Sequence, residues 1–233
     1  MSLGTLKAKD LHNQGVNKGE VIKVANIDDV LSWKWTGKRL LEDLIRIDYE
    51  NMEGLDSEHE GNAEQWAPVF MDNPDTWRLL IGSAKNIVGY WHFVSLFDYE
   101  YNLIKQGCLM ESTITTDKIK MLIVPGWYNI YFSAICIRPQ YRNVGTFTLL
   151  LSSIMDVFTN LAREELLIKE ISANAYTPFG KSMCEKLGFK YVRDHASHGQ
   201  IYETNMTSLL KCNRRILRKG SEELRGLMEK GEN

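Results

Sequence analysis

The 233-residue sequence lacks the features of several specialised classes of protein. It has only four cysteines, and no two of them form a C-x-x-C pair: Cys108, Cys136, Cys184 and Cys212. This spacing is typical of reduced thiols in a cytoplasmic protein and argues against a disulfide framework or a structural zinc site. Its apolar runs are short, such as 121–124, whereas a membrane-spanning helix needs about 18 apolar residues. We therefore expect a cytoplasmic protein without a metal or a membrane-embedded segment.

The chain also has no excess of charge of either sign. It carries 28 Lys+Arg against 30 Asp+Glu, a formal net charge of −2. This balance gives no general reason to expect nucleic acid or an anionic membrane as a partner. A chain that is 44% hydrophobic can bury a sizeable core at this length. We predict one main domain over residues 20–206, with a polar N-terminal arm at 1–19 and a C-terminal helical extension at 207–233.

Hydrophobic periodicity predicts strands and helices that alternate in the second half of the chain. The apolar residues after Gly145 recur at helical spacing from Phe147 to Leu161. Strands are predicted at 128–137, 167–173, 189–192 and 200–205, and a hairpin is predicted from 77–82 and 87–96. Residues 97–126 are compatible with helix or strand. The pattern indicates an α/β fold, with a mixed sheet and helices on both of its faces.

The acidic stretch between Asp48 and Glu64 stands out in the first half of the chain. Seven of its residues are Asp or Glu, and it also contains glycine. Because carboxylates are rarely buried without a partner, we expect this stretch to be an exposed connection.

The most informative segment runs from Ile135 to Phe147 and reads as a buried strand, a tight turn and the start of a helix. A helix start leaves about four backbone N–H groups unpaired, and the helix dipole adds a partial positive charge there. Gly145 allows a phosphate to approach the backbone closely, and Arg142 adds a cation. The segment is therefore a candidate pyrophosphate site; the alternative is an ordinary strand-to-helix turn.

Two blocks of sequence resemble one protein family. The run P-x-Y-R-N-V-G-T at 139–146 resembles the acetyl-CoA-binding motif of the GNAT N-acetyltransferase superfamily. The block at 177–189 is similar to the last conserved block of that family, whose helix ends in Y-E-K-L-G-F. The resemblance covers roughly 77–205. It implies the acyl-CoA N-acyltransferase fold, in which a mostly antiparallel sheet has a parallel pair at the cofactor cleft.

The resemblance also implies an activity, transfer of an acetyl group from acetyl-CoA, as co-substrate, to a primary amine. The amine belongs to a small molecule or a peptide, and it attacks directly within a ternary complex. The implied cofactor-binding residues lie on the strand, the turn and the later block: Ile135, Cys136, Ile137, Arg142, Asn143, Val144, Gly145, Thr146, Phe147, Asn174 and Thr177. Thr177 replaces an asparagine of the family. Phe147 replaces a small residue of the motif and Cys184 replaces the tyrosine that many members use as general acid, so a non-catalytic acyl-CoA-binding or regulatory module is the alternative. A transferase of longer acyl chains is a third.

The residues that would move protons are less well defined by the sequence. Cys184 occupies the position of the family's tyrosine general acid and is the candidate acid. The alternative for Cys184 is a structural role as a buried core residue, in which case Ser182 or Tyr176 is the candidate acid. His92 and Glu111 are the candidate bases. The alternative for His92 is a hydrogen-bonded histidine of the sheet, and the alternative for Glu111 is a solvated charge in a loop. A base that acts through water is also compatible with the sequence. A sheet edge or the last helix offers a surface for a homodimer.

Overall fold

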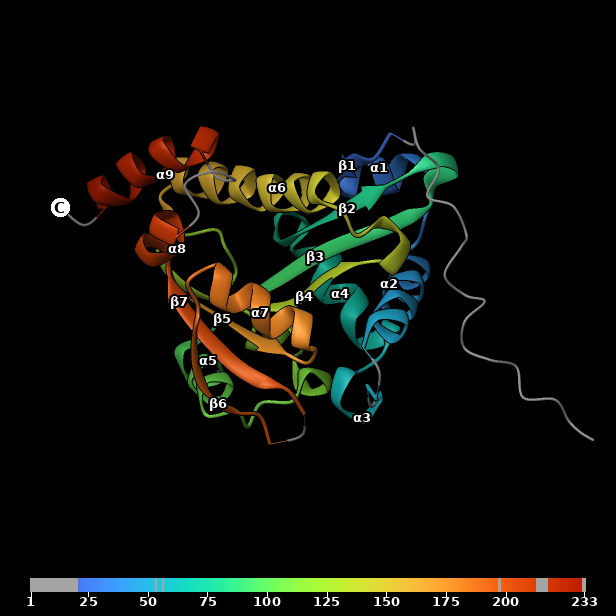
Figure 1. Ribbon diagram of the computed structural model, residues 1–233, viewed down its shortest axis with the longest axis horizontal. Helices are drawn as coiled ribbons and strands as arrows, with labels where there is room; N and C mark the ends of the chain where they lie inside the picture. The colour runs from blue at the N-terminus through green and yellow to red at the C-terminus, as the bar shows by residue number, and fades with distance from the viewer. Residues whose placement is uncertain (1–20, 53, 56, 197, 213–217, 232–233) are drawn as a thin grey trace, which may run out of the picture.

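The computed structural model describes residues 21–52, 54–55, 57–196, 198–212 and 218–231 (Figure 1). They form one seven-stranded sheet in the order β1-β2-β3-β4-β5-β7-β6, in which only β4 and β5 run parallel to each other. The strands are β1 (Lys23–Ala25), β2 (Trp77–Ile81), β3 (Ile87–Leu96), β4 (Gly126–Ile137), β5 (Leu166–Ala175), β6 (Lys190–Asp194) and β7 (Gln200–Asn205). The predicted fold class is confirmed, while the predicted arm at 1–19 lies outside the described residues.

Helices cover both faces of the sheet because its strands are apolar on both sides. Trp91 and Phe93 of β3 belong to one hydrophobic cluster, and Tyr90 and Val94 belong to the other. The first cluster includes residues of α6 (Val144–Arg163), α8 (Met206–Cys212) and α9 (Arg218–Gly231), with α7 (Pro178–Lys186) packed against it. The second includes residues of α1 (Ile27–Ser32), α2 (Gly37–Asn51), α4 (Ala63–Asp72) and α5 (Asp98–Lys105).

The long helix α6 is the central helix of the first cluster. By length and composition alone it would be able to cross a membrane, but 56% of its most apolar window is buried inside the protein. Leu150, Ile154 and Phe158 recur at helical spacing and are buried against the sheet. The apolar character of α6 is therefore explained by core packing.

The structure resolves two points about the secondary structure: the segment 97–126, which was compatible with helix or strand, and the C-terminal segment, which was predicted as a helix. The stretch after β3 forms the helix α5, followed by short 3-10 turns rather than strands, among them η3 (Glu111–Thr113). Within the predicted C-terminal helix the structure describes α8 and α9, and residues 213–217 lie outside the described part. Leu224 and Met228 of α9 are buried in the same cluster as α6, so α9 helps to form the core.

The expectation of an exposed connection between residues 48 and 64 is wrong. Helix α2 continues to Asn51, and a short helix α3 (Ser57–Glu60) follows. Asp48 follows Ile47 directly and Leu44 by four residues, so it lies on the buried stripe of α2. Asp48 and Glu60 are each only 6% exposed. Their burial results from helical spacing and tertiary packing, which outweigh the average preference of carboxylates for water.

A bulge in β4 opens the sheet on one side. His92 of β3 pairs with Ala134 and Phe93 pairs with Phe132, so Ser133 is an extra residue in β4. The parallel pairing of β4 with β5 ends at Phe132 and Ala173. Within the described residues β5 has no partner on β4 beyond that point. The two strands therefore separate at the bulge, and the last five residues of β4 form an edge that faces a gap.

Candidate functional site

The separation of β4 from β5 exposes main-chain groups of β4. The amide of Arg138 donates to Val88 O of β3 at 2.9 Å, so alternate residues before it also face β3. The main-chain groups of Ile135 and Ile137 consequently face the gap, and Ile137 O accepts a hydrogen bond from Arg142 Nε at 3.0 Å there. This edge is able to pair with an extended amide-containing chain. We call the gap between β4 and β5, together with the start of α6, the cleft.

The N-terminus of α6 lies at the end of the cleft, after the 3-10 turn η5 (Pro139–Tyr141). Asn143 is the N-cap, and its Oδ1 accepts a hydrogen bond from the Thr146 amide at 3.0 Å. The next amides, of Val144 and Gly145, have no partner within the helix, and both residues are exposed. A Cβ at Gly145 would meet only Asn143 Oδ1, at 3.2 Å. These observations fit the binding of a phosphate by the amides of Val144 and Gly145. The Thr146 amide is not available for it, because it donates to Asn143 Oδ1.

Phe147 and Arg142 decide whether the turn is open. Phe147 packs against the core cluster beneath α6, so its ring does not fill the turn. The Arg142 guanidinium donates to Ile137 O and to Asn51 Oδ1 of α2, and it lies 5.7 Å from the centre of the Phe179 ring of α7. Arg142 thus spans the space between the turn and α7, beside the exposed amides.

The other predicted cofactor-binding residues have structural roles that the motifs did not indicate. Thr177 is the N-cap of α7 and accepts from the Gly180 amide at 3.0 Å. Asn174 Nδ2 donates to His198 O at 3.1 Å and so holds the loop before β7. Cys136 Sγ donates to Asp48 Oδ1 at 3.1 Å, away from the cleft. Cofactor binding by Asn174, Thr177 and Cys136 stays a prediction, although the main chain of Cys136 faces β3 and its thiol faces Asp48.

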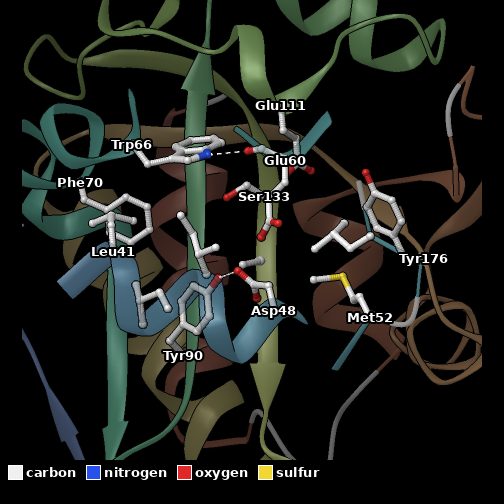
Figure 2. Close-up of a pocket in the computed structure, with 14 residues that line it drawn as sticks. Leu41, Asp48, Met52, Glu60, Trp66, Phe70, Tyr90, Glu111, Ser133 and Tyr176 are labelled. Carbon is white, nitrogen blue, oxygen red and sulfur yellow. Dashed lines mark hydrogen bonds between the residues drawn. The ribbon is translucent and has the colours of Figure 1, made fainter. Parts of the chain in front are cut away.

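A pocket lies next to the bulge on the face of the sheet covered by α2 and α4 (Figure 2). It holds about 440 Å³ of empty space, counted with the part open to solvent. Ser133 and Ala134 of β4, and Tyr176 directly after β5, line it and connect it to the cleft. Its remaining polar wall consists of the carboxyl groups of Asp48, Glu60 and Glu111 together with Tyr90. Among the described residues that line the pocket there is no Lys, Arg or His.

Asp48 has the best-satisfied of the three carboxyl groups. It accepts hydrogen bonds from the Tyr90 hydroxyl and from Cys136 Sγ. Burial raises the pKa of Asp48 to about 6, and the donors Tyr90, Cys136 and Glu60 limit that rise. Burial also raises the pKa values of Tyr90 and Cys136, so both stay protonated as donors. Asp48 is therefore largely ionised at neutral pH.

Glu60 is the carboxyl group that holds a proton. Burial, followed by the charges of Asp48 and Glu111, raises its pKa to about 9. Its side chain is hydrogen-bonded to Asp48, and Figure 2 shows both among the carboxyl groups that gather beside Ser133. The other oxygen, Oε2, is buried without a hydrogen-bond partner. A buried acceptor without a donor is costly, so Glu60 Oε2 is a vacant acceptor at this site.

Glu111 reaches the pocket from η3. Its Oε1 accepts a hydrogen bond from the Tyr131 hydroxyl of β4 at 2.5 Å. Burial of the carboxyl group and, to a lesser extent, the charge of Asp48 raise the pKa of Glu111 to about 8, against the opposing effect of the Tyr131 hydrogen bond. A base is most effective when its pKa lies close to the working pH. The structure thus places the predicted base Glu111 beside Ser133 and Tyr176, together with two acids that sequence reasoning did not identify.

His92 lies behind the pocket rather than in it. It is fully buried, its ring is stacked on Phe70 at 3.9 Å, and its Nδ1 lies 2.5 Å from Ser133 Oγ. Burial lowers the pKa of His92 to about 3, so the imidazole is neutral at physiological pH. This placement favours a positioning role toward Ser133 over the predicted role as the base.

Cys184 and Tyr176 are the two candidates for a proton donor. Cys184 packs against the cluster formed with α6, whereas the pocket lies on the other face of the sheet. Burial raises the pKa of the Cys184 thiol to about 12. Tyr176 lines the pocket, and burial raises the pKa of its hydroxyl, which therefore stays protonated. Position favours Tyr176, the alternative that the sequence offered, and leaves Cys184 as a prediction to be tested.

No family model and no curated protein matches the sequence. Among solved structures the chain is similar to a GNAT-family acetyltransferase from Staphylococcus aureus, with 14% identity, a TM-score of 0.49, and coverage of 79% of this chain and 99% of that one. An acetyltransferase from Thermus thermophilus has 14% identity, a TM-score of 0.39, and coverage of 79% and 96%. N-acetylglutamate synthase from Neisseria gonorrhoeae, complexed with coenzyme A and N-acetyl-glutamate, has 12% identity, a TM-score of 0.40, and coverage of 81% and 36%.

Proposed function

We propose that the protein is an acetyl-CoA-dependent N-acetyltransferase that acetylates a primary amine. The observation that carries this proposal is the bulge at Ser133, where the cleft and the carboxyl-lined pocket meet. A thioester lying along the β4 edge would bring its carbonyl carbon to this point. An amine in the pocket would approach the same point from the other side.

The cleft supplies the groups that acetyl-CoA requires. The exposed amides of Val144 and Gly145 and the nearby Arg142 suit a diphosphate, which is an anion with many acceptor oxygens. The main-chain groups that face the gap suit the amides of a pantetheine arm. A main-chain N–H at the bulge would also stabilise the thioester oxygen as it gains charge, and one such donor is typically worth about 10²–10³ in rate.

The pocket supplies the proton chemistry. At neutral pH a primary amine is almost entirely an ammonium ion, which has no lone pair for attack. Glu111, with a pKa of about 8, would take one proton from the ammonium. The amine nitrogen then forms a bond to the carbonyl carbon, the carbon–sulfur bond breaks, and the thiolate leaves with the bonding electron pair. Tyr176 or water protonates the thiolate, and the amide nitrogen loses its remaining extra proton to solvent.

The alternative, a module that binds acyl-CoA without catalysis, uses the cleft but gives the pocket no purpose. Three carboxyl groups gathered beside the thioester position, one of them poised as a base, favour the enzyme. Titration calorimetry with acetyl-CoA, followed by an assay of thiol release with a panel of amines, separates the two. We expect both binding and turnover. Binding without turnover of any amine would support the module, and absence of binding would reject both.

A further inference from the structure

We infer that the acceptor is a primary amine with a single ammonium group, a short apolar body and no carboxylate. This inference rests on the proposed function and specifies the substrate class of the same site. It follows from the arrangement of polar and apolar groups in the pocket beside Ser133.

The described residues at the polar end of the pocket include no positively charged side chain. Glu60 is only 6% exposed, and its Oε2 is buried without a hydrogen-bond partner, next to Asp48 and Glu111. An ammonium group has three N–H donors and one positive charge, so it can satisfy this oxygen and its neighbours together. Among the described residues no group of three or more His, Cys, Asp or Glu side chains is arranged to hold a metal ion. An organic cation is therefore the better match.

The remainder of the pocket is apolar. Leu41 and Leu44 form its inner wall, and the half-buried side chains of Ile45, Met52 and Leu55 line the part nearer to solvent. A hydrocarbon chain attached to the ammonium would pack against these residues. A second ammonium group there would lose its water without gaining a partner, which is costly. Diamines and polyamines should therefore bind less well than a simple alkylamine.

The same charges exclude amino acids. An α-carboxylate lies two bonds from the amine nitrogen, so it would be placed among Asp48, Glu60 and Glu111. The described lining offers no Lys, Arg or His to pair with it. Asp48 is largely ionised at neutral pH, so a second carboxylate beside it raises the free energy of the complex.

A matched series of four compounds tests the inference by calorimetry on the full chain without acetyl-CoA. n-Butylamine is the reference; norvaline adds a carboxylate, 1,4-diaminobutane adds a second ammonium, and n-butanol removes the charge. We expect n-butylamine to bind at least tenfold more tightly than the other three. Because Glu60 holds a proton at neutral pH, binding should also release protons, which titrations in two buffers of different ionisation enthalpy measure. Tighter binding of norvaline or of the diamine would overturn the inference, and so would no binding of n-butylamine.

Substitutions then assign the binding to this pocket. Glu60→Gln should weaken n-butylamine at least tenfold and reduce the proton release, to which Glu111 also contributes. Glu64→Gln is the matched control, because Glu64 is exposed and paired with Lys38; it should leave the affinity unchanged. Circular dichroism confirms that each variant is folded. Unchanged affinity in Glu60→Gln would place the amine elsewhere. Failure of acetyl-CoA to bind would defeat the proposed function, whereas these amine titrations are read without it, so the two failures are distinguishable.

Discussion

The cleft and the pocket meet at Ser133, but the cleft is formed mainly by main-chain groups and the pocket mainly by side chains. The cleft consists mainly of main-chain groups, namely the free edge of β4 and the first amides of α6, with Arg142 beside them. The pocket consists mainly of side chains, which come from α2, α3, α4, β3, β4, η3 and the segment after β5. A main-chain site depends on backbone shape, whereas a side-chain site depends on the chemistry of each residue. Substitutions in the two regions should therefore affect different measured quantities.

The largest effect that sharpens this comparison is expected in the pocket, from Glu111→Gln. Without the base, kcat/KM for the amine should fall by about 10²-fold or more, while the Kd of acetyl-CoA stays unchanged. In the wild type, kcat/KM should rise with pH as Glu111 loses its proton, with a midpoint near the pKa of about 8. The ionisable groups that face Glu111 are Asp48, Glu60, Tyr131 and Tyr176.

Tyr131→Phe refines the test of Glu111. The Tyr131 hydrogen bond lowers the pKa of Glu111, so its loss should move the midpoint of the pH profile upward while Glu111 remains in place. Steady-state assays from pH 6 to 10 measure this. A profile that is identical in the wild type and in both variants would mean that Glu111 is not the base.

The next effect compares the two faces of the sheet. Tyr176→Phe removes a hydroxyl from the pocket and should lower kcat by about tenfold if it protonates the leaving thiolate. Cys184→Ala, on the opposite face, should change kcat by about twofold or less, although the lost packing lowers stability. The reverse order of effects would restore Cys184 as the general acid predicted from its position in the sequence.

An effect of about the same size is expected from Arg142, the charged side chain beside the amides of the cleft. Arg142→Ala should weaken acetyl-CoA about tenfold, because a charged hydrogen bond to a phosphate typically contributes about 1.5–3 kcal/mol. Arg142→Lys keeps the charge but loses the Nε hydrogen bond to Ile137 O, and it should retain part of the affinity. Titration calorimetry at two salt concentrations measures both variants. If Arg142→Ala binds acetyl-CoA as tightly as the wild type does, Arg142 does not contribute to phosphate binding and the amides of Val144 and Gly145 form the site alone.

The smallest effect concerns stability. The folded-state pKa of Glu60 is about 9, far above that of an unfolded glutamate, so the folded protein holds a proton that the unfolded chain has lost. Stability should therefore fall as pH rises from about 5 to 9. Glu60→Gln removes this penalty. At pH 8.5 it should raise Tm by about 2–4 °C for each kcal/mol gained in the free energy of unfolding, with little change in Tm at pH 5. A Tm difference that is the same at both pH values would contradict the assignment, and Glu64→Gln is the control.

The same contrast explains what the sequence was able to predict. The cleft was predictable because its signals are local: an apolar strand, then Asn143 and Gly145 at the start of a periodic helix. The bulge at Ser133 was not predictable, because it depends on register against β3. In the pocket Glu111 was predicted as a base and Tyr176 as an alternative acid. Asp48 and Glu60 were interpreted as exposed, and their burial depends on contacts between segments distant in sequence, which composition does not encode. The helical phase of Leu44, Ile47 and Asp48 was the available signal.

The central claim is that exposed amides at the start of α6 bind the diphosphate of acetyl-CoA. Calorimetric titration of acetyl-CoA into the wild type and Gly145→Glu tests it most directly, with Gly145→Ala and the exposed Ser152→Glu on the same helix as controls. We predict that Gly145→Glu loses at least about 100-fold in affinity while remaining folded. Gly145→Ala should lose much less, and Ser152→Glu should bind like the wild type. Undiminished affinity in Gly145→Glu would contradict the account.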